Sequence, residues 1–234
     1  MHTLFHEDFV AAAAPVELGD DEIHLWLFPR REPGANARAD ASGSLRGVLA
    51  AYLGADPAGL RIERDVGGKP YLPDAALQFN QSHSAGALLV GVSRTQPLGV
   101  DIESRARMRP YLEIARRYFT ADEAEALAAL PEDQRQRSFL ELWSAKEAVL
   151  KAIGRGIAFG LDRVGFELDA AGTTRRLVHV ADEVGVPEQW QVVRLAPQTG
   201  VTGALAWRGA GMRLRGFIAV DDSAAATIRT SRAS

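Results

Sequence analysis

Hydrophobic and polar positions in the first part of the chain follow two different spacings, and each spacing predicts an element. Residues 22–28, Glu-Ile-His-Leu-Trp-Leu-Phe, are typical of a β-strand. Apolar residues from Leu45 to Leu53 recur every three or four positions, which predicts a helix ending at Gly54. Residues 29–43 between them are rich in Pro, Gly, Arg and Ala and are predicted to form a loop.

Three short apolar segments follow and predict strands at Leu77–His83, Ala87–Ser93 and Leu98–Glu103. The sequence Arg-Thr-Gln-Pro at 94–97 is a turn signal between the second and the third. These two strands are therefore predicted to pair as a hairpin.

Helical patterns dominate the middle of the chain. Thr120 and Glu123 have the spacing of a capping box, so a helix is expected to start there and to end at Pro131. A longer helix is predicted from Glu132 to Ile153, terminated by glycine. The segments beyond it that alternate like strands of an antiparallel sheet are Val164–Leu168, Leu177–Val180, Gln189–Leu195, Gly203–Trp207 and Gly216–Val220.

The order of these elements predicts an α+β fold made of two similar halves, each mixing helix with antiparallel strand. The N-terminal half is expected to span residues 1–104 and the C-terminal half residues 105–222. The Ala, Ser and Thr residues at 223–234 predict a flexible tail.

Composition narrows the classes of function. Hydrophobic residues make up 47% of the 234 residues and charged residues 24%, which is ordinary for a soluble globular protein. The net charge of −3 argues against nucleic-acid binding through overall charge. The absence of cysteine excludes disulfides, thiolate metal sites and cysteine nucleophiles. No apolar run approaches the roughly 20 residues that span a bilayer, so we expect no membrane association and a cytoplasmic location.

Asp101 and Glu103 are the first candidates for chemistry. In a strand they share one face, with Cα atoms roughly 6.5–7 Å apart, while Val100 and Ile102 face the core. Two carboxylates this close repel unless a cation lies between them, and Mg²⁺ prefers oxygen ligands. A solvated strand end would account for the pair equally well.

The long predicted helix carries charges beside an apolar stripe. Trp143, Lys146, Glu147, Leu150 and Lys151 fall within one arc of about 140°. Charges next to buried apolar residues indicate a cleft. The alternative is an ordinary ion pair four residues apart with lysines that extend to solvent, although this does not explain the tryptophan.

Small polar residues and lysines complete the set of candidates. Ser82, His83 and Ser84 end a strand and suit a phosphate group. Only Lys69, Lys146 and Lys151 are lysines, and all other basic residues are arginine apart from histidine, which suggests that these three positions need a compact ammonium. Together with the carboxylates they fit metal-assisted chemistry at a phosphate or pyrophosphate.

Four motifs in order carry a family resemblance: Gly68-Lys69-Pro70, Phe-Asn-Gln-Ser-His-Ser at 79–84, Gly-Val-Asp-Ile-Glu at 99–103, and Trp-Ser-Ala-Lys-Glu-Ala-Val-Leu-Lys-Ala-Ile-Gly-Arg-Gly at 143–156. The chain resembles the 4′-phosphopantetheinyl transferases of the surfactin-synthetase-activating type. The resemblance implies a pseudo-dimeric fold, with two α+β halves related by a pseudo-twofold axis and the site at their seam. It also implies transfer of the phosphopantetheine arm of coenzyme A to a serine of an acyl or peptidyl carrier protein, with release of adenosine 3′,5′-bisphosphate.

The resemblance also implies roles for individual residues. Asp101, Glu103 and Glu147 would hold Mg²⁺ on the pyrophosphate of coenzyme A. Glu147 would be the base for the carrier serine and Lys151 would neutralise the pyrophosphate, so these two are the catalytic candidates. The candidates for binding coenzyme A are Arg38, Lys69, Pro70, Ser82, His83, Lys146 and Lys151. Arg38, with Arg30 and Arg31, would replace a longer basic helix that family members carry in this region and that contacts the 3′-phosphate.

Two other functions fit parts of the pattern, namely a Mg²⁺-dependent hydrolase of nucleotide pyrophosphates and a non-catalytic module that binds coenzyme A or a carrier protein. For the transferase, a monomer is expected, with carrier protein and coenzyme A as partners and no nucleic acid. A basic segment just after the Asp101 strand would dock the acidic carrier, and its residues are Arg105, Arg107, Arg109, Arg116 and Arg117.

Overall fold

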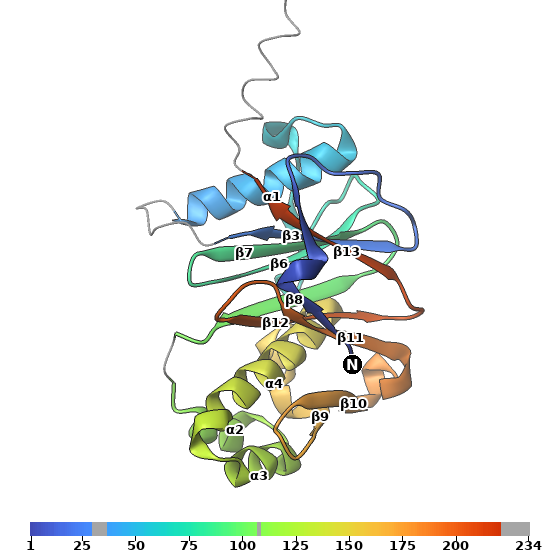
Figure 1. Cartoon of the computed structure of the whole chain (residues 1–234). Helices are drawn as coiled ribbons and strands as arrows, with labels where there is room; N and C mark the ends of the chain where they lie inside the picture. Colours follow the sequence, from blue (N-terminus) through green and yellow to red (C-terminus); the bar gives the residue numbers. More distant parts are fainter. Residues whose placement is uncertain (30–36, 107–108, 221–234) are drawn as a thin grey trace, which may run out of the picture.

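The structure is a computed structural model that describes residues 1–29, 37–106 and 109–220, without the side chains of residues 37–40. Its elements stack in layers (Figure 1). Helix α1 (Ala37–Leu53) covers the outer face of a five-stranded sheet, and a four-stranded sheet packs on the inner face. Below lie α2 (Tyr111–Tyr118), α3 (Ala121–Ala129) and α4 (Glu132–Ile153). This arrangement confirms the predicted α+β class.

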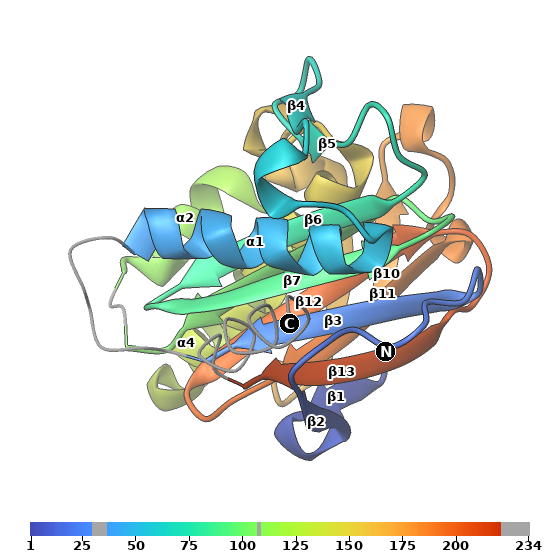
Figure 2. The ribbon, with the colours of Figure 1, turned by 90° about the horizontal axis from the view of Figure 1, so that it is seen from above.

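The five-stranded sheet has the order β2-β13-β3-β7-β6. Its strands are β2 (Phe9–Ala12), β13 (Arg213–Ala219), β3 (Glu22–Phe28), β7 (Ala87–Ser93) and β6 (Gln78–Ser84). Strand β13 runs parallel to β2 and β3, so the prediction that all late strands are antiparallel is wrong for β13. Figure 2 shows α1 lying along this sheet from above.

The four-stranded sheet has the order β1-β11-β12-β8. Its strands are β1 (Thr3–Phe5), β11 (Trp190–Ala196), β12 (Val201–Arg208) and β8 (Leu98–Ser104). Two small sheets pair β9 (Val164–Leu168) with β10 (Thr174–Val180) and β4 (Glu63–Arg64) with β5 (Pro70–Tyr71). The short 3₁₀ helices are η1 (His6–Asp8), η2 (Pro57–Gly59), η3 (Ile157–Phe159), η4 (Leu161–Arg163), η5 (Asp182–Val184) and η6 (Pro187–Gln189).

Three hydrophobic cores hold the layers together. Leu25 and Leu89 of the upper sheet meet Val100 and Leu205 of the lower one in the core between the sheets. The outer face of the upper sheet packs on α1, and the outer face of the lower sheet packs on α4. Because alternate residues of a strand face opposite sides, each sheet can bury both of its faces.

The predicted hairpin of residues 87–93 and 98–103 does not form. Strand β7 pairs with β3 and β6, whereas β8 crosses to the lower sheet and pairs antiparallel with β12. The turn signal correctly marks a change of direction, but it does not determine which strand becomes the neighbour. The hairpin that does form joins β6 to β7.

Side chains of β6 cover the free edge of β8. The Val100 N–H donates to Asn80 Oδ1 (2.9 Å), the Ile102 N–H to Ser82 Oγ (3.2 Å) and the Ser104 N–H to Ser84 Oγ (3.0 Å). Both sets of residues are two apart, so one face of β6 supplies acceptors for three outward-pointing amides of β8. The edges of the two sheets are thus joined without a backbone ladder.

Several predicted bounds need correction. Helix α1 begins at Ala37, so the predicted loop over 29–43 is wrong from residue 37 onward, and α2 lies in a segment without a predicted element. The predicted strand at 22–28 and helix at 132–153 are confirmed at both ends. The predicted tail at 223–234 lies outside the described residues. Because β8 lies in the sheet of β11 and β12 while β13 lies beside β3, the boundary at residue 104 and the pseudo-twofold axis stay predictions.

We expect Asn80→Ala to lower the free energy of unfolding by about 1–3 kcal/mol, because it leaves the buried Val100 N–H without an acceptor. Urea denaturation of the purified protein measures this loss. Ser84→Ala is the matched control, because its bond to Ser104 is only partly buried and its loss should cost less. Equal losses for the two variants would contradict the role given to the buried bond.

Candidate functional site

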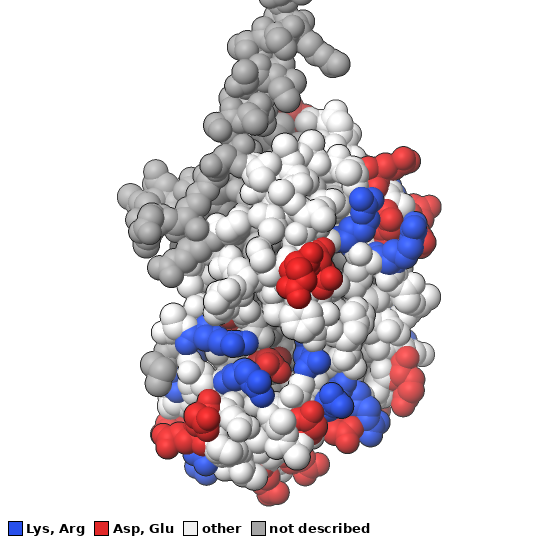
Figure 3. All heavy atoms as spheres, in the orientation of Figure 1, with Lys and Arg blue, Asp and Glu red and all other residues white. Residues whose placement is uncertain are grey.

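A cleft of about 500 Å³ opens where β6 and β8 meet the C-terminal half of α4. Figure 3 shows a hollow on this side of the molecule with acidic side chains inside and basic ones around it. Of the residues proposed from the sequence, those that line the cleft are Lys69, Pro70, Ser82, His83, Asp101, Glu103, Glu147 and Lys151. Lys146 does not line it, and the side chain of Arg38 lies outside the described residues.

A glycine brings strand and helix together at this site. A Cβ atom on Gly99 would lie 2.0 Å from the carbonyl oxygen of Ala148 and 2.4 Å from the nitrogen of Ala152, both in α4. Only glycine permits this approach. The predicted alternation of β8 is confirmed, because Val100 and Ile102 enter the core between the sheets while Asp101 faces α4.

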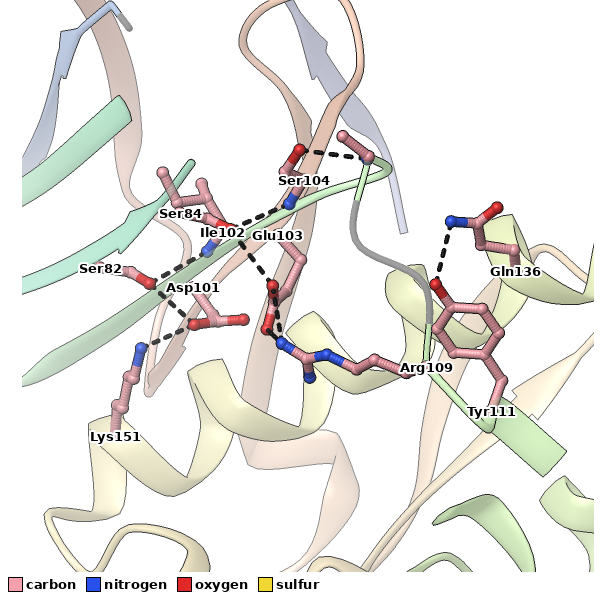
Figure 4. A network of polar contacts seen from close by, with 11 residues as sticks. Ser82, Ser84, Asp101, Ile102, Glu103, Ser104, Arg109, Tyr111, Gln136 and Lys151 are labelled. Atoms are coloured by element: carbon pink, nitrogen blue, oxygen red, sulfur yellow. Dashed lines mark hydrogen bonds and ion pairs between the residues drawn. The ribbon is translucent and has the colours of Figure 1, made fainter. Parts of the chain in front are cut away.

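Asp101 is held from both sides. Its Oδ1 accepts hydrogen bonds from Lys151 Nζ (2.7 Å) and Ser82 Oγ (2.8 Å), as Figure 4 shows. Its Oδ2 is buried and has no hydrogen-bond partner. Such an orphan oxygen costs free energy unless a ligand satisfies it.

Glu147 is a carboxyl group of the cleft with a strongly raised pKa. Burial, the nearby Asp101 carboxylate and, more weakly, Glu103 raise its pKa to about 7, with Lys151 opposing them. Its Oε1 is buried without a hydrogen-bond partner. Three carboxyl groups therefore repel one another around one space.

These carboxylates are not already gathered around one point. Among the described residues, no group of three or more His, Asp or Glu side chains has the geometry of a metal site. Asp101 and Glu103 instead have cationic side chains beside them, Lys151 and Arg109. A divalent cation would have to draw the carboxylates together.

Arg109 belongs to the cleft, which the sequence interpretation missed. Its Nη2 lies 3.3 Å from Glu103 Oε1, and its guanidinium lies 5.7 Å from the ring centre of Trp143. Ser84 Oγ also donates to Glu103, at 3.2 Å. The signal available in the sequence was the tryptophan on the charged face of α4, since arginine stacks on aromatic rings.

The ammonium of Lys69 is turned away from the open cleft. Its Nζ donates to the carbonyl oxygens of Leu98 (2.9 Å) and Ala152 (3.3 Å). Burial lowers the pKa of Lys69 to about 8, against a smaller opposite effect of Asp65. Lys69 therefore lines the cleft mainly with its stem.

Lys146 lies away from the open cleft, and its predicted contact with coenzyme A stays a prediction. It is fully buried, 2.6 Å from Glu123 Oε2, and it donates to the carbonyl oxygens of Leu161 (2.9 Å) and Val164. Glu123 is itself the acceptor of the capping box at Thr120. These contacts tie α4 to α3 and β9, so in this structure Lys146 supports the helix.

The polar residues of β6 either face the cleft or bond to the edge of β8. His83 is exposed at the cleft, where it can meet a ligand. Ser82 and Ser84 already accept from β8 amides and donate to Asp101 and Glu103. Asn80, which the sequence interpretation did not select, holds the same edge. The described residues contain no helix that is both long and apolar enough to cross a membrane.

Known proteins similar to this chain share one activity. The pattern of the 4′-phosphopantetheinyl transferase superfamily matches residues 97–194. The 4′-phosphopantetheinyl transferase HetI of Nostoc sp. is 30% identical over 221 residues, which cover 82% of this chain and 90% of the relative. The 4′-phosphopantetheinyl transferase Sfp of Bacillus subtilis is 34% identical over 129 residues, 55% of this chain and 56% of the relative. A human L-aminoadipate-semialdehyde dehydrogenase-phosphopantetheinyl transferase is 29% identical over 162 residues, 63% and 51% respectively.

We expect Glu147→Gln to stabilise the protein at alkaline pH. The pKa of Glu147 is raised from 4.5 to about 7, so the native state increasingly resists its ionisation as pH rises through this window. The stability gained from the glutamine should be small at pH 5 and approach about 3 kcal/mol above pH 8. Urea unfolding of both proteins at pH 5 and pH 8.5, without divalent cations, measures it. A gain that does not depend on pH would show that burial does not perturb this carboxyl group.

Proposed function

The chain belongs to the 4′-phosphopantetheinyl transferase superfamily and is an enzyme of that class, and we propose that its cleft transfers the phosphopantetheine arm of coenzyme A to a serine of an acyl or peptidyl carrier protein. The observation that carries the proposal is that Asp101, Glu103 and Glu147 line one cleft beside Lys151, with two buried carboxylate oxygens that have no partner. Mutually repelling carboxylates next to a lysine suit a ligand that brings both a divalent cation and phosphate oxygens.

The residues present fit Mg²⁺. Asp101, Glu103 and Glu147 offer only oxygen ligands, and the orphan atoms Asp101 Oδ2 and Glu147 Oε1 are free to accept a cation. When bound, Mg²⁺ would neutralise charge on the pyrophosphate and so ease cleavage of its bond.

Glu147 is proposed as the base as well as a ligand. Without a bound cation its pKa of about 7 suits a group that accepts a proton at neutral pH, and a bound Mg²⁺ would lower that pKa. The carrier serine oxygen attacks the phosphorus attached to the pantetheine arm, and its proton goes to Glu147. The phosphorus–oxygen bond to adenosine 3′,5′-bisphosphate breaks, and that product leaves.

Cations already in the cleft suit the pyrophosphate of coenzyme A and the 5′-phosphate that leaves with adenosine 3′,5′-bisphosphate. Lys151 bonds to Asp101 and to the Val100 carbonyl oxygen (3.1 Å), so it is held where a phosphate would meet it. Arg109 is a second candidate beside Glu103. His83 and Pro70 remain the candidates for the nucleotide of coenzyme A, and Arg38 stays a prediction for the 3′-phosphate.

The oligomeric state of the enzyme is part of the same proposal. Asp101 and Glu103 on β8 and Glu147 and Lys151 on α4 all come from one chain, so a monomer would contain the whole set. A monomeric enzyme acting in the cytoplasm, without nucleic acid, is the form we propose.

Intact-mass measurement of apo carrier proteins after incubation with the enzyme, coenzyme A and Mg²⁺ tests the function. We expect the carrier to gain one phosphopantetheine, and to gain none when EDTA replaces Mg²⁺.

Glu147→Gln should abolish the gain in carrier mass while the variant remains folded, since the amide keeps the shape of the side chain and removes its charge and basicity.

Two results would overturn this function. Cleavage of coenzyme A without carrier would indicate the alternative hydrolase. Binding of coenzyme A without any modified carrier, across fatty-acid, polyketide and peptide carriers, would indicate the alternative binding module.

The basic segment after β8 is proposed as the docking surface for an acidic carrier. Arg105, Arg116 and Arg117 are exposed, whereas Arg109 is engaged in the cleft and Arg107 lies outside the described residues. Complementary charge speeds encounter more than it strengthens binding, and salt screens it over about 8–10 Å.

We expect the double variant Arg105→Glu and Arg116→Glu to raise the KM for carrier roughly tenfold at low salt and to flatten its salt dependence. The KM for coenzyme A should stay unchanged. Arg215→Glu, an exposed reversal on β13, is the control for the change in net charge. Equal shifts in the two KM values, or the same effect from Arg215→Glu, would exclude this docking surface.

A further inference from the structure

Two of the three lysines of the chain lie in α4, and the third contacts its last turn. All three donate to backbone carbonyl oxygens. Lys146 bonds to Leu161 and Val164, and Lys151 bonds to Val100. Lys69 differs, because it lies in the turn between β4 and β5 and bridges two other elements: Leu98 begins β8 and Ala152 lies in the last turn of α4. Its ammonium therefore joins the strand that carries Asp101 to the helix that carries Glu147.

The turn that carries Lys69 is built to press against the end of α4. The Lys69 N–H donates to Asp65 Oδ1 (2.8 Å), and the Gly68 N–H donates to the Asp65 carbonyl oxygen (2.9 Å). A Cβ atom on Gly67 would lie 1.8 Å from the carbonyl oxygen of Gly154, the residue that ends the helix. The turn is thus ordered by its own bonds and fits closely on the helix terminus.

We propose that Lys69 is a positioning residue, which locks the C-terminal end of α4 onto β8 and thereby sets the spacing of Glu147 and Lys151 from Asp101 and Glu103. This inference rests on the proposed transferase function for its kinetic consequences. It gives Lys69 a different part from the contact with coenzyme A that its sequence position suggested.

The charge of the Lys69 ammonium supports this positioning role. Carbonyl groups at a helix C-terminus carry partial negative charge that a cation stabilises. The compact ammonium offers three donors from a single point, and the two carbonyl oxygens at 2.9 and 3.3 Å take up two of them. Burial lowers the pKa of Lys69, which means that keeping its ammonium group charged at this position costs free energy.

Lys69→Met keeps the apolar stem and removes the donors. We expect kcat to fall by about tenfold or more, since small misplacements of reacting groups cost large factors in rate. The KM for coenzyme A should stay within about twofold, because no contact with the substrate is lost. Hydrogen–deuterium exchange, which needs no activity, should speed up in residues 148–155 and 98–101 and stay unchanged in β11.

Arg46→Met is the matched control. Arg46 Nη1 also clamps two carbonyl oxygens, those of Pro57 (3.0 Å) and Leu60 (2.8 Å), but it does so beside α1 and outside the cleft. The Arg46→Met variant should lower the free energy of unfolding without changing kcat or the hydrogen exchange of α4. An equal fall in kcat would show that any loss of stability explains the Lys69 result.

Gly67→Ala disturbs the same joint without changing the Lys69 ammonium, and it serves if Lys69→Met fails to fold. It should lower kcat at constant KM for coenzyme A and speed exchange in residues 148–155. A raised KM with unchanged kcat and exchange in Lys69→Met would overturn the proposal and make Lys69 a substrate contact. If the wild-type protein transfers nothing, the proposed function fails, while the exchange data still decide whether Lys69 locks the helix.

Discussion

Hydrogen bonds from side chains of β6 to the edge of β8 join the two sheets at the point where the candidate site lies. Strand β8 belongs to the lower sheet by its backbone ladder with β12, yet its other edge faces the upper sheet. An unsatisfied strand edge is costly when buried and prone to aberrant pairing when exposed. Asn80, Ser82 and Ser84 satisfy that edge with side-chain oxygens, so the two sheets join there without a continuous ladder.

The same seam orients the candidate site. Ser82 and Ser84 accept from β8 amides and donate to the carboxylates of Asp101 and Glu103, so each hydroxyl sets both the strand and a functional group on it (Figure 4). Gly99 then lets α4 lie directly on the strand, which brings Glu147 into range. The joint between the sheets and the cleft are therefore one structural unit, and a change at the seam reaches the carboxylates.

Charge is buried around α4 in two different ways. Lys146 and Glu123 are fully paired and anchor the helix to the elements below it. Glu147 is left with an orphan oxygen and a raised pKa, which stores unfavourable free energy in the folded protein. Functional sites commonly keep carboxyl groups whose pKa is perturbed in this way.

The sequence by itself determined the elements whose signals are local: the strand at 22–28, the capping box at Thr120, the helix at 132–153 and the alternation that separates Val100 from Asp101. It also brought most of the site residues to one cleft through their motifs. Tertiary structure alone decided that β8 leaves β7 for β12 and that Lys69 and Lys146 bond to backbone carbonyls. Periodicity reports which face of an element is buried, but not what covers it. Every residue, moreover, has the same backbone carbonyl acceptor, so the sequence does not reveal which carbonyl oxygen a lysine will contact.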